Sequence, residues 1–141
     1  MESLAQLREK LPEFEKLHVS LACIVQGTAT DAEELCGPFG LTPSCIPDPQ
    51  KESYAKIGLD RAKWKELLFP SDELRQRRKE NRDAGFSISI TRSLKATCDI
   101  LLLPGAAIVA RGGKILWLHR GANPADLPSA NDLLEKVRQH V

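Results

Sequence analysis

Long apolar runs and net charge are both scarce in this sequence, and each absence excludes a class of protein. No run of about 18 consecutive apolar residues occurs, so we expect no transmembrane helix. The formal net charge is only +1, which gives the chain as a whole no attraction to nucleic acid or membrane surfaces. The N-terminal segment MESLAQLREK lacks the apolar core of a secretory signal peptide. These absences predict a cytoplasmic protein that binds neither nucleic acid nor membrane.

A C-x-x-C pair is also missing, although the chain contains four cysteines, Cys23, Cys36, Cys45 and Cys98. In the reducing cytosol such residues are buried or redox-active thiols rather than a disulfide framework. The three histidines show no metal-ligand spacing with the cysteines, so we expect no structural zinc site and no other cofactor. The cysteines are therefore the candidates for chemistry.

The first part of the chain alternates between helix and strand patterns. With 141 residues and an apolar fraction of 42%, the chain is expected to form one domain over residues 1–141 with its own core. The alternation favours a parallel sheet with helices on both faces. The expected elements are a helix over 2–17 that Pro12 kinks or divides, a buried strand over 18–25, a helix capped by Thr30 that stops near Gly37, a strand over 41–46, and a helix from Asp48 to Gly58.

The middle of the chain departs from this alternation and is expected to be a charged helical insertion around residues 60–83. Its basic residues are Arg75, Arg77, Arg78, Lys79 and Arg82, and its apolar residues around Pro70 are Trp64, Leu67, Leu68 and Phe69. One interpretation is a binding surface for an anion or a protein partner. The other is a solvated helix face, because Glu73, Glu80 and Asp83 dilute the positive charge. Beyond the insertion, residues 87–91 and 98–103 each have the pattern of a strand.

A β-hairpin is expected near the C-terminus. Two short apolar runs, Ala106 to Ala110 and Lys114 to His119, flank an Arg-Gly-Gly turn whose glycines accept a positive φ. Runs this apolar are typical of strands covered on both faces. After a loop, Ser129 is expected to cap a last helix, with Asp132 completing the capping pattern. Its core-facing residues are Leu133, Leu134 and Val137.

Four stretches of the chain carry a family resemblance. They are LAQLREKLPEFEKLHVSLACIVQG, LTPSCIPDPQKESYAKIGL, PGAAIVARGGKI and ANPADLPSANDLLEKV. Together they resemble the peroxiredoxin-like branch of the alkyl hydroperoxide reductase/thiol-specific antioxidant (AhpC/TSA) family. The resemblance implies an α/β, thioredoxin-like fold with a central mixed sheet flanked by helices. It also implies that Pro104 is a cis-proline at the edge of the active site.

The chain departs from the family pattern at its N-terminus. In that family a strand and a cysteine motif precede the first helix, whereas this sequence begins at Met1, where that motif would just have ended. The strand would be central, between the expected strands 18–25 and 106–110. Three explanations remain open. The sequence is a fragment or starts at an internal methionine, a neighbouring subunit in a homodimer donates a strand, or residues 87–91 fill the place.

The four cysteines differ in their prospects as catalytic thiols. Cys45 lies just ahead of an expected helix start, where the helix dipole favours a thiolate, although the charge of Asp48 opposes it. Cys36 lies near a helix C-terminus, where the dipole disfavours one. By the resemblance, Cys98 lies near the active-site edge, whereas Cys23 is expected to be an inert core residue. A Cys36–Cys45 disulfide stays open, because sequence does not give the Cα separation that it requires.

Two functions of different classes follow from these patterns. The first is a thiol-dependent antioxidant oxidoreductase, which would reduce peroxides or disulfides through Cys45, Cys36 or Cys98, with thioredoxin or glutathione as electron donor. The second is a redox-silent, thioredoxin-fold binding module that uses the basic helix and the apolar patch of residues 60–83. An in-frame cysteine motif directly upstream of Met1 in the gene would favour the first function.

Overall fold

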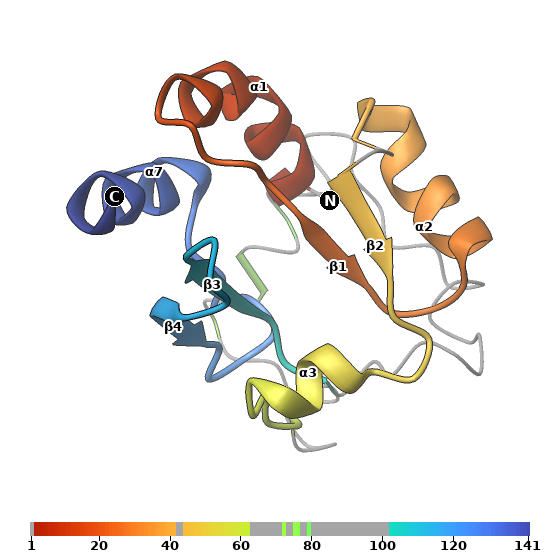
Figure 1. The fold of residues 1–141 in the computed structure, drawn as a ribbon. Helices are drawn as coiled ribbons and strands as arrows, with labels where there is room; N and C mark the ends of the chain where they lie inside the picture. Colours follow the sequence, from red (N-terminus) through yellow and green to blue (C-terminus); the bar gives the residue numbers. More distant parts are fainter. Residues whose placement is uncertain (1, 42–43, 63–71, 73–74, 77–78, 80–101) are drawn as a thin grey trace.

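The computed structural model describes residues 2–41, 44–62, 72, 75, 76, 79 and 102–141, which form both helices and strands (Figure 1). None of the described helices is long and apolar enough to cross a membrane. In chain order the elements are α1 (Glu2–Lys16), β1 (Cys23–Val25), α2 (Ala29–Cys36), the 3-10 helix η1 (Gly37–Phe39), β2 (Cys45–Pro47), α3 (Glu52–Lys56), β3 (Gly105–Val109), β4 (Ile115–Arg120) and α7 (Ala130–His140).

Helix α1 contacts two hydrophobic clusters, because its apolar residues recur at steps of three and four. Leu4 and Leu11 pack against the N-terminal cluster, whose buried members are Val25, Ala32, Cys36, Leu41 and Cys45. Leu7 and Leu17 pack against the C-terminal cluster, whose buried members are Phe14, Ile108, Leu134 and Val137. The helix continues through Pro12 as one element, so the expected division into two pieces is wrong. Packing on both sides of the proline holds the two halves of the helix in one piece.

The first strand is much shorter than expected, because the chain turns sharply after α1. The backbone N–H of His18 donates to the carbonyl of Glu15, and that of Val19 donates to the carbonyl of Phe14. His18 itself has a φ of 56°, so these residues form a Schellman motif. Val19 and Phe14 both belong to the C-terminal cluster, which is the apolar contact that accompanies this motif. Strand β1 therefore begins at Cys23 rather than at residue 18.

The N-cap of helix α2 lies two residues before the expected one. Thr28 rather than Thr30 is the N-cap, and its side chain accepts from the backbone N–H of Asp31. The Asp31 carboxylate in return accepts from the backbone N–H of Thr28 at 2.8 Å. Gly27 has a φ of 110°, and a Cβ there would lie 2.5 Å from the Asp31 carboxylate. The capping box thus requires glycine at this position. The helix ends at Cys36, close to the expected stop.

Helix α3 begins at Glu52, four residues after Asp48, so the expected start is wrong by about one turn. Asp48 nevertheless caps the helix from a distance. Its carboxylate accepts from the backbone N–H groups of Glu52 at 3.1 Å and Ser53 at 2.9 Å. Residues 49–51 form a turn between the capping carboxylate and the helix, which is why the Asp-Pro pattern misplaces the first helical residue.

The described strands form two separate pairs. Strands β1 and β2 are parallel, as the alternation of helices and strands predicts, and β3 and β4 are antiparallel. No ladder joins β1 to β3, so the single mixed sheet that we expected does not occur among the described residues. Helix α3 bridges the two pairs instead. The Tyr54 hydroxyl donates to the carbonyl of Ile24 in β1, and Arg120 of β4 donates to the carbonyl of Ile57.

The hairpin and the last helix agree closely with the sequence prediction. Gly113 supplies a positive φ in the turn, and each strand end differs from its expected position by one residue. The expectation that both faces are covered is wrong, because Val109 is 57% exposed and Ile115 is 44% exposed. Ser129 caps α7 in a capping box with Asp132, as expected.

The left-handed cap at His18 leads to a stability prediction. The exposed His18 side chain places a Cβ at a backbone conformation that only glycine adopts without cost. Replacing it by glycine (His18→Gly) should raise the free energy of unfolding by about 1 kcal/mol, measured by urea denaturation. The control is His18→Ala, which keeps the Cβ and should give no such gain. A His18→Gly protein no more stable than His18→Ala would contradict the Schellman geometry.

Candidate functional site

Two of the candidate catalytic cysteines are joined in the structure. Cys36, the last residue of α2, and Cys45, the first residue of β2, form a disulfide with a Cα–Cα distance of 6.5 Å. The connecting segment is folded back by hydrogen bonds from Leu41 N–H to the Cys36 carbonyl and from Ser44 N–H to the Leu41 carbonyl. The pairing that the sequence left open is therefore formed.

This disulfide lies inside the N-terminal cluster. Cys36 is completely buried, and Cys45 is 9% exposed. The expected electrostatic activation of Cys45 is wrong, since α3 begins seven residues after it and Asp48 already occupies the first N–H groups of that helix. The sulfur atoms are thus shielded from solvent by apolar neighbours. A thiol or peroxide that reacts with this pair must therefore first gain access to one of the two sulfur atoms.

Cys23 is a free thiol in contact with the same cluster. It lies in β1 directly opposite Cys45 of β2 in the parallel register. Burial raises the pKa of the Cys23 thiol above its ordinary value of 9.0, because the apolar surroundings disfavour the thiolate. Three of the four cysteines therefore meet in one cluster, although the sequence pattern indicated only an inert core residue at position 23.

Pro104 does not have the geometry that the resemblance implies. The described residues contain no cis peptide bond, so Pro104 is trans. It stands directly before β3, and its carbonyl accepts from the backbone N–H of Gly121 at 2.8 Å. A proline at this point costs no ladder hydrogen bond, and the trans form is the default for an X-Pro bond. Pro104 therefore serves as the entry to the hairpin.

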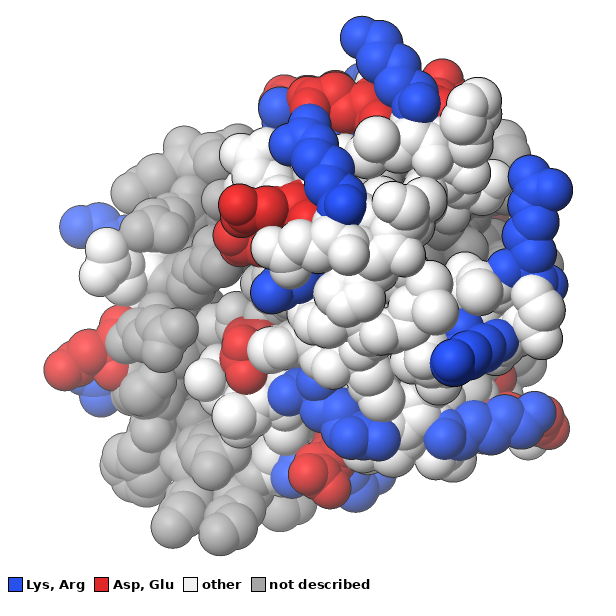
Figure 2. Space-filling view, turned by 60° about the vertical axis from the view of Figure 1, so that its left-hand side comes forward, with Lys and Arg blue, Asp and Glu red and all other residues white. Residues whose placement is uncertain are grey.

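The other candidate residues fall mainly outside the described residues. These are Cys98, Arg77, Arg78, Trp64 and Phe69. Arg75 and Lys79 are described, and both are helical and exposed. Exposure agrees with a partner surface and with a solvated helix face alike, so the partner-binding role stays a prediction. On the face shown in Figure 2, Lys and Arg side chains of the described residues alternate with Asp and Glu rather than forming a field of one sign.

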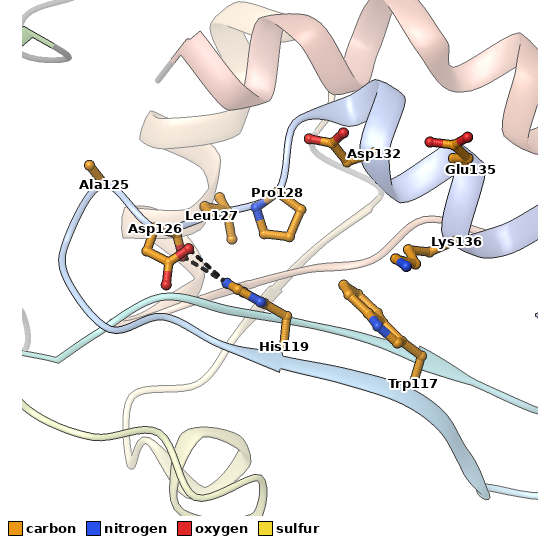
Figure 3. Close-up of a pocket in the computed structure, with 9 residues that line it drawn as sticks. All are labelled: Trp117, His119, Ala125, Asp126, Leu127, Pro128, Asp132, Glu135 and Lys136. Carbon is orange, nitrogen blue, oxygen red and sulfur yellow. Dashed lines mark hydrogen bonds and ion pairs between the residues drawn. The ribbon is translucent and has the colours of Figure 1, made fainter. Parts of the chain in front are cut away.

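The sequence patterns missed an open pocket between β4, the following loop and α7 (Figure 3). Its volume is about 510 Å³. Trp117 and His119 form its aromatic wall, with ring centroids 6.2 Å apart and ring planes 16° from parallel. The other lining residues are Ala125, Asp126, Leu127, Pro128, Asp132, Glu135 and Lys136. The spacing of two between Trp117 and His119 on a strand was the signal that both face one side.

His119 is held in one orientation by Asp126. Its Nε2 lies 3.1 Å from the Asp126 carboxylate and 3.2 Å from the Asp126 carbonyl. Both partners only accept hydrogen bonds, so Nε2 carries the proton. The other carboxylate oxygen of Asp126 accepts from the backbone N–H of Ala122 at 2.8 Å. None of the three cysteines that the structure describes lines this pocket, so the pocket is separate from the disulfide.

Metal binding has little support in the described part of the chain. No group of three or more His, Cys, Asp or Glu residues there is arranged to hold a metal ion. Among the described residues that line the pocket, none joins His119 and Asp126 to form such a group.

The loop that the disulfide closes allows its effect on stability to be predicted. The two cysteines are 9 residues apart in sequence. Loop-closure entropy for a loop of this size corresponds to about 2–3 kcal/mol, so reduction should lower the free energy of unfolding by that amount. Urea denaturation with and without a phosphine reductant measures the difference. The double variant Cys36→Ala/Cys45→Ala serves as the control and should not respond to the reductant. Equal stability of the wild-type protein in both states would refute the pairing.

The raised pKa of Cys23 predicts its reactivity. Because the thiolate is the nucleophile, alkylation of Cys23 in the folded protein should accelerate about tenfold per pH unit between about pH 7 and pH 9 without levelling off. Iodoacetamide labelling under non-reducing conditions, followed by peptide mapping, distinguishes Cys23 from Cys98. The urea-unfolded protein is the control and should react faster at every pH in this range. A plateau well below pH 9 in the folded protein would mean that the thiol is activated rather than buried.

Comparison with known proteins adds family membership to this geometry. A family model described as AhpC/TSA antioxidant enzyme matches residues 6–123. No curated protein and no solved structure matches the chain. The match covers both strand pairs and three described helices, and the family implies a thioredoxin-like fold, with which the mixed helix and strand architecture agrees. The chain belongs to the AhpC/TSA family of antioxidant proteins.

Proposed function

We propose that this protein is a thiol-dependent antioxidant oxidoreductase that uses the Cys36–Cys45 pair to reduce peroxides. The observation that carries the proposal is the disulfide itself, in a chain of an antioxidant family. A pair that forms a disulfide accepts and releases two electrons, which is the exchange that peroxide reduction needs.

Cys45 is the better of the two residues to meet the peroxide. It is 9% exposed, whereas Cys36 is fully buried at the end of α2. In the reduced protein the Cys45 thiolate attacks one peroxide oxygen, the O–O bond breaks, and the other oxygen leaves as an alcohol or water after taking up a proton. The Cys45 sulfenic acid then condenses with the Cys36 thiol, which forms the disulfide and releases water.

A thiol donor closes the cycle. Two successive thiol–disulfide exchanges with a small thiol such as glutathione, or with a dithiol protein such as thioredoxin, return both cysteines to thiols and oxidise the donor. The burial of both sulfurs makes this half of the cycle the slower one for a bulky donor.

Reaction of the reduced protein with one equivalent of hydrogen peroxide tests the proposal. The wild-type protein should consume peroxide and form the Cys36–Cys45 disulfide, seen by peptide mapping. The variant Cys45→Ser should consume peroxide at least about tenfold more slowly, because it lacks the thiolate that attacks the peroxide oxygen. Ser44→Ala, at the neighbouring residue, is the matched control and should react as the wild type does. A wild-type rate no higher than that of the unfolded chain would refute a catalytic role.

A redox-silent binding module is the second candidate, and one observation favours it. Cys36 is fully buried and Cys45 is 9% exposed. Such burial is typical of a disulfide that stabilises the fold rather than one that reacts. Under this alternative, reduction lowers stability without conferring any reaction with peroxide. The exposed helical residues Arg75 and Lys79 then become the first places to test for partner binding, by charge reversal.

A further inference from the structure

Cys45 has a second cysteine neighbour besides its disulfide partner. In the parallel pair of β1 and β2, Cys23 is the direct register partner of Cys45. The residues after them, Ile24 and Ile46, are 38% and 47% exposed. Since side chains alternate between the faces of a strand, Cys23 and Cys45 lie together on the opposite, core-facing side. Contact of Cys23 with the N-terminal cluster, which contains Cys36 and Cys45, agrees with this placement.

The backbone spacing permits a bond between these two residues. Neighbouring strands lie about 4.8 Å apart. Disulfides form when the Cα atoms are about 4.4–6.8 Å apart. The register partners therefore fall within the range that a disulfide requires, as does the Cys36–Cys45 pair at 6.5 Å. The Cα separations therefore allow Cys45 to bond either neighbour.

We propose that Cys23 replaces Cys36 as the disulfide partner of Cys45. The disulfide then joins β2 to β1 instead of to the buried end of α2. The Cys23 thiolate attacks the Cys45 sulfur, a Cys23–Cys45 bond forms, and the Cys36–Cys45 bond breaks. Cys36 leaves as a thiolate and takes up the proton that Cys23 released. The step consumes no oxidant or reductant, because one disulfide replaces another.

The exposure of the three cysteines indicates what the exchange would do in the proposed function; this role rests on that function. Cys36 is fully buried and Cys45 is 9% exposed, whereas Cys23 is partly exposed. An electron donor therefore reaches the disulfide more easily once Cys23 carries one of its sulfurs. Attack of the donor on Cys23 forms a mixed disulfide and releases Cys45 as the leaving thiol. Cys23 is thus the position through which electrons enter the buried pair.

Two effects make the exchange away from the Cys36–Cys45 disulfide slow. Burial holds most of Cys23 as the unreactive thiol, since its pKa is raised. Cys36 is also a poor leaving group, because it lies at the C-terminal end of α2, where the helix dipole disfavours a thiolate. Both effects slow the exchange without changing its endpoints. Once the Cys23–Cys45 form arises, the donor withdraws it by reducing it.

Disulfide mapping in a variant that lacks Cys36 tests the new bond directly. The reduced variant Cys36→Ala is oxidised with one equivalent of diamide, which joins thiol pairs without peroxide chemistry. The expected product is an intramolecular Cys23–Cys45 disulfide, and the matched variant Cys23→Ala/Cys36→Ala should leave Cys45 as a free thiol. Free Cys23 and Cys45 in the oxidised Cys36→Ala protein, or pairing of either with Cys98, would overturn the proposal. Cys36→Ser, with circular dichroism on both variants, guards against a loss of fold.

Reduction kinetics test the role of Cys23 as the entry point. Oxidised wild type and Cys23→Ser, each with an intact Cys36–Cys45 bond, are treated with glutathione. Reduction of the variant should be at least about tenfold slower, and equal rates would overturn this role. Peroxide oxidation of the reduced proteins is measured separately. A protein that forms the Cys23–Cys45 bond with diamide but does not react with peroxide would refute the proposed function and leave the exchange intact.

Discussion

The packing of α1 into two hydrophobic clusters is the constraint on which the rest of the structure depends. Leu4 and Leu11 contact the N-terminal cluster, and Leu7 and Phe14, offset by three residues, belong to the C-terminal one. In Figure 1 the helix lies across one end of the molecule, with α7 on one side and α2 on the other. Since a two-stranded sheet is marginally stable by itself, each strand pair needs this shared helix for a core. The disulfide and the aromatic pocket therefore have the same support.

Specific hydrogen bonds from α3 complement this apolar packing at the opposite end of the strand pairs (Figure 1). The Tyr54 hydroxyl reaches the Ile24 carbonyl in β1 at 3.0 Å, and Arg120 of β4 reaches the Ile57 carbonyl. These bonds link segments far apart in sequence to a helix of only 5 residues, which could not persist in isolation. The strand pairs are thus joined by packing at α1 and by side-chain hydrogen bonds at α3.

Local signals in the sequence predicted the features that neighbouring residues determine. Ser129 with Asp132 caps α7, Gly113 forms the hairpin turn, and the alternation of helices and strands predicted the parallel pair. The errors arose where distant contacts decide. The short β1 follows from the Schellman turn at His18, which burial of Val19 against Phe14 stabilises. Likewise, the His119–Asp126 contact and the meeting of Cys23 with Cys45 depend on tertiary placement.

The cysteine cluster combines two requirements that oppose each other. A redox thiol needs its thiolate, yet an apolar cluster disfavours that charge and raises the pKa of Cys23. The same cluster keeps Cys36 and Cys45 close enough to pair, because their neighbours fix α2 against β2. The exposure of these three residues decreases from the partly exposed Cys23 through Cys45 to the fully buried Cys36. Under the proposed function, this burial slows the reactions of the thiols and at the same time protects the disulfide within the core.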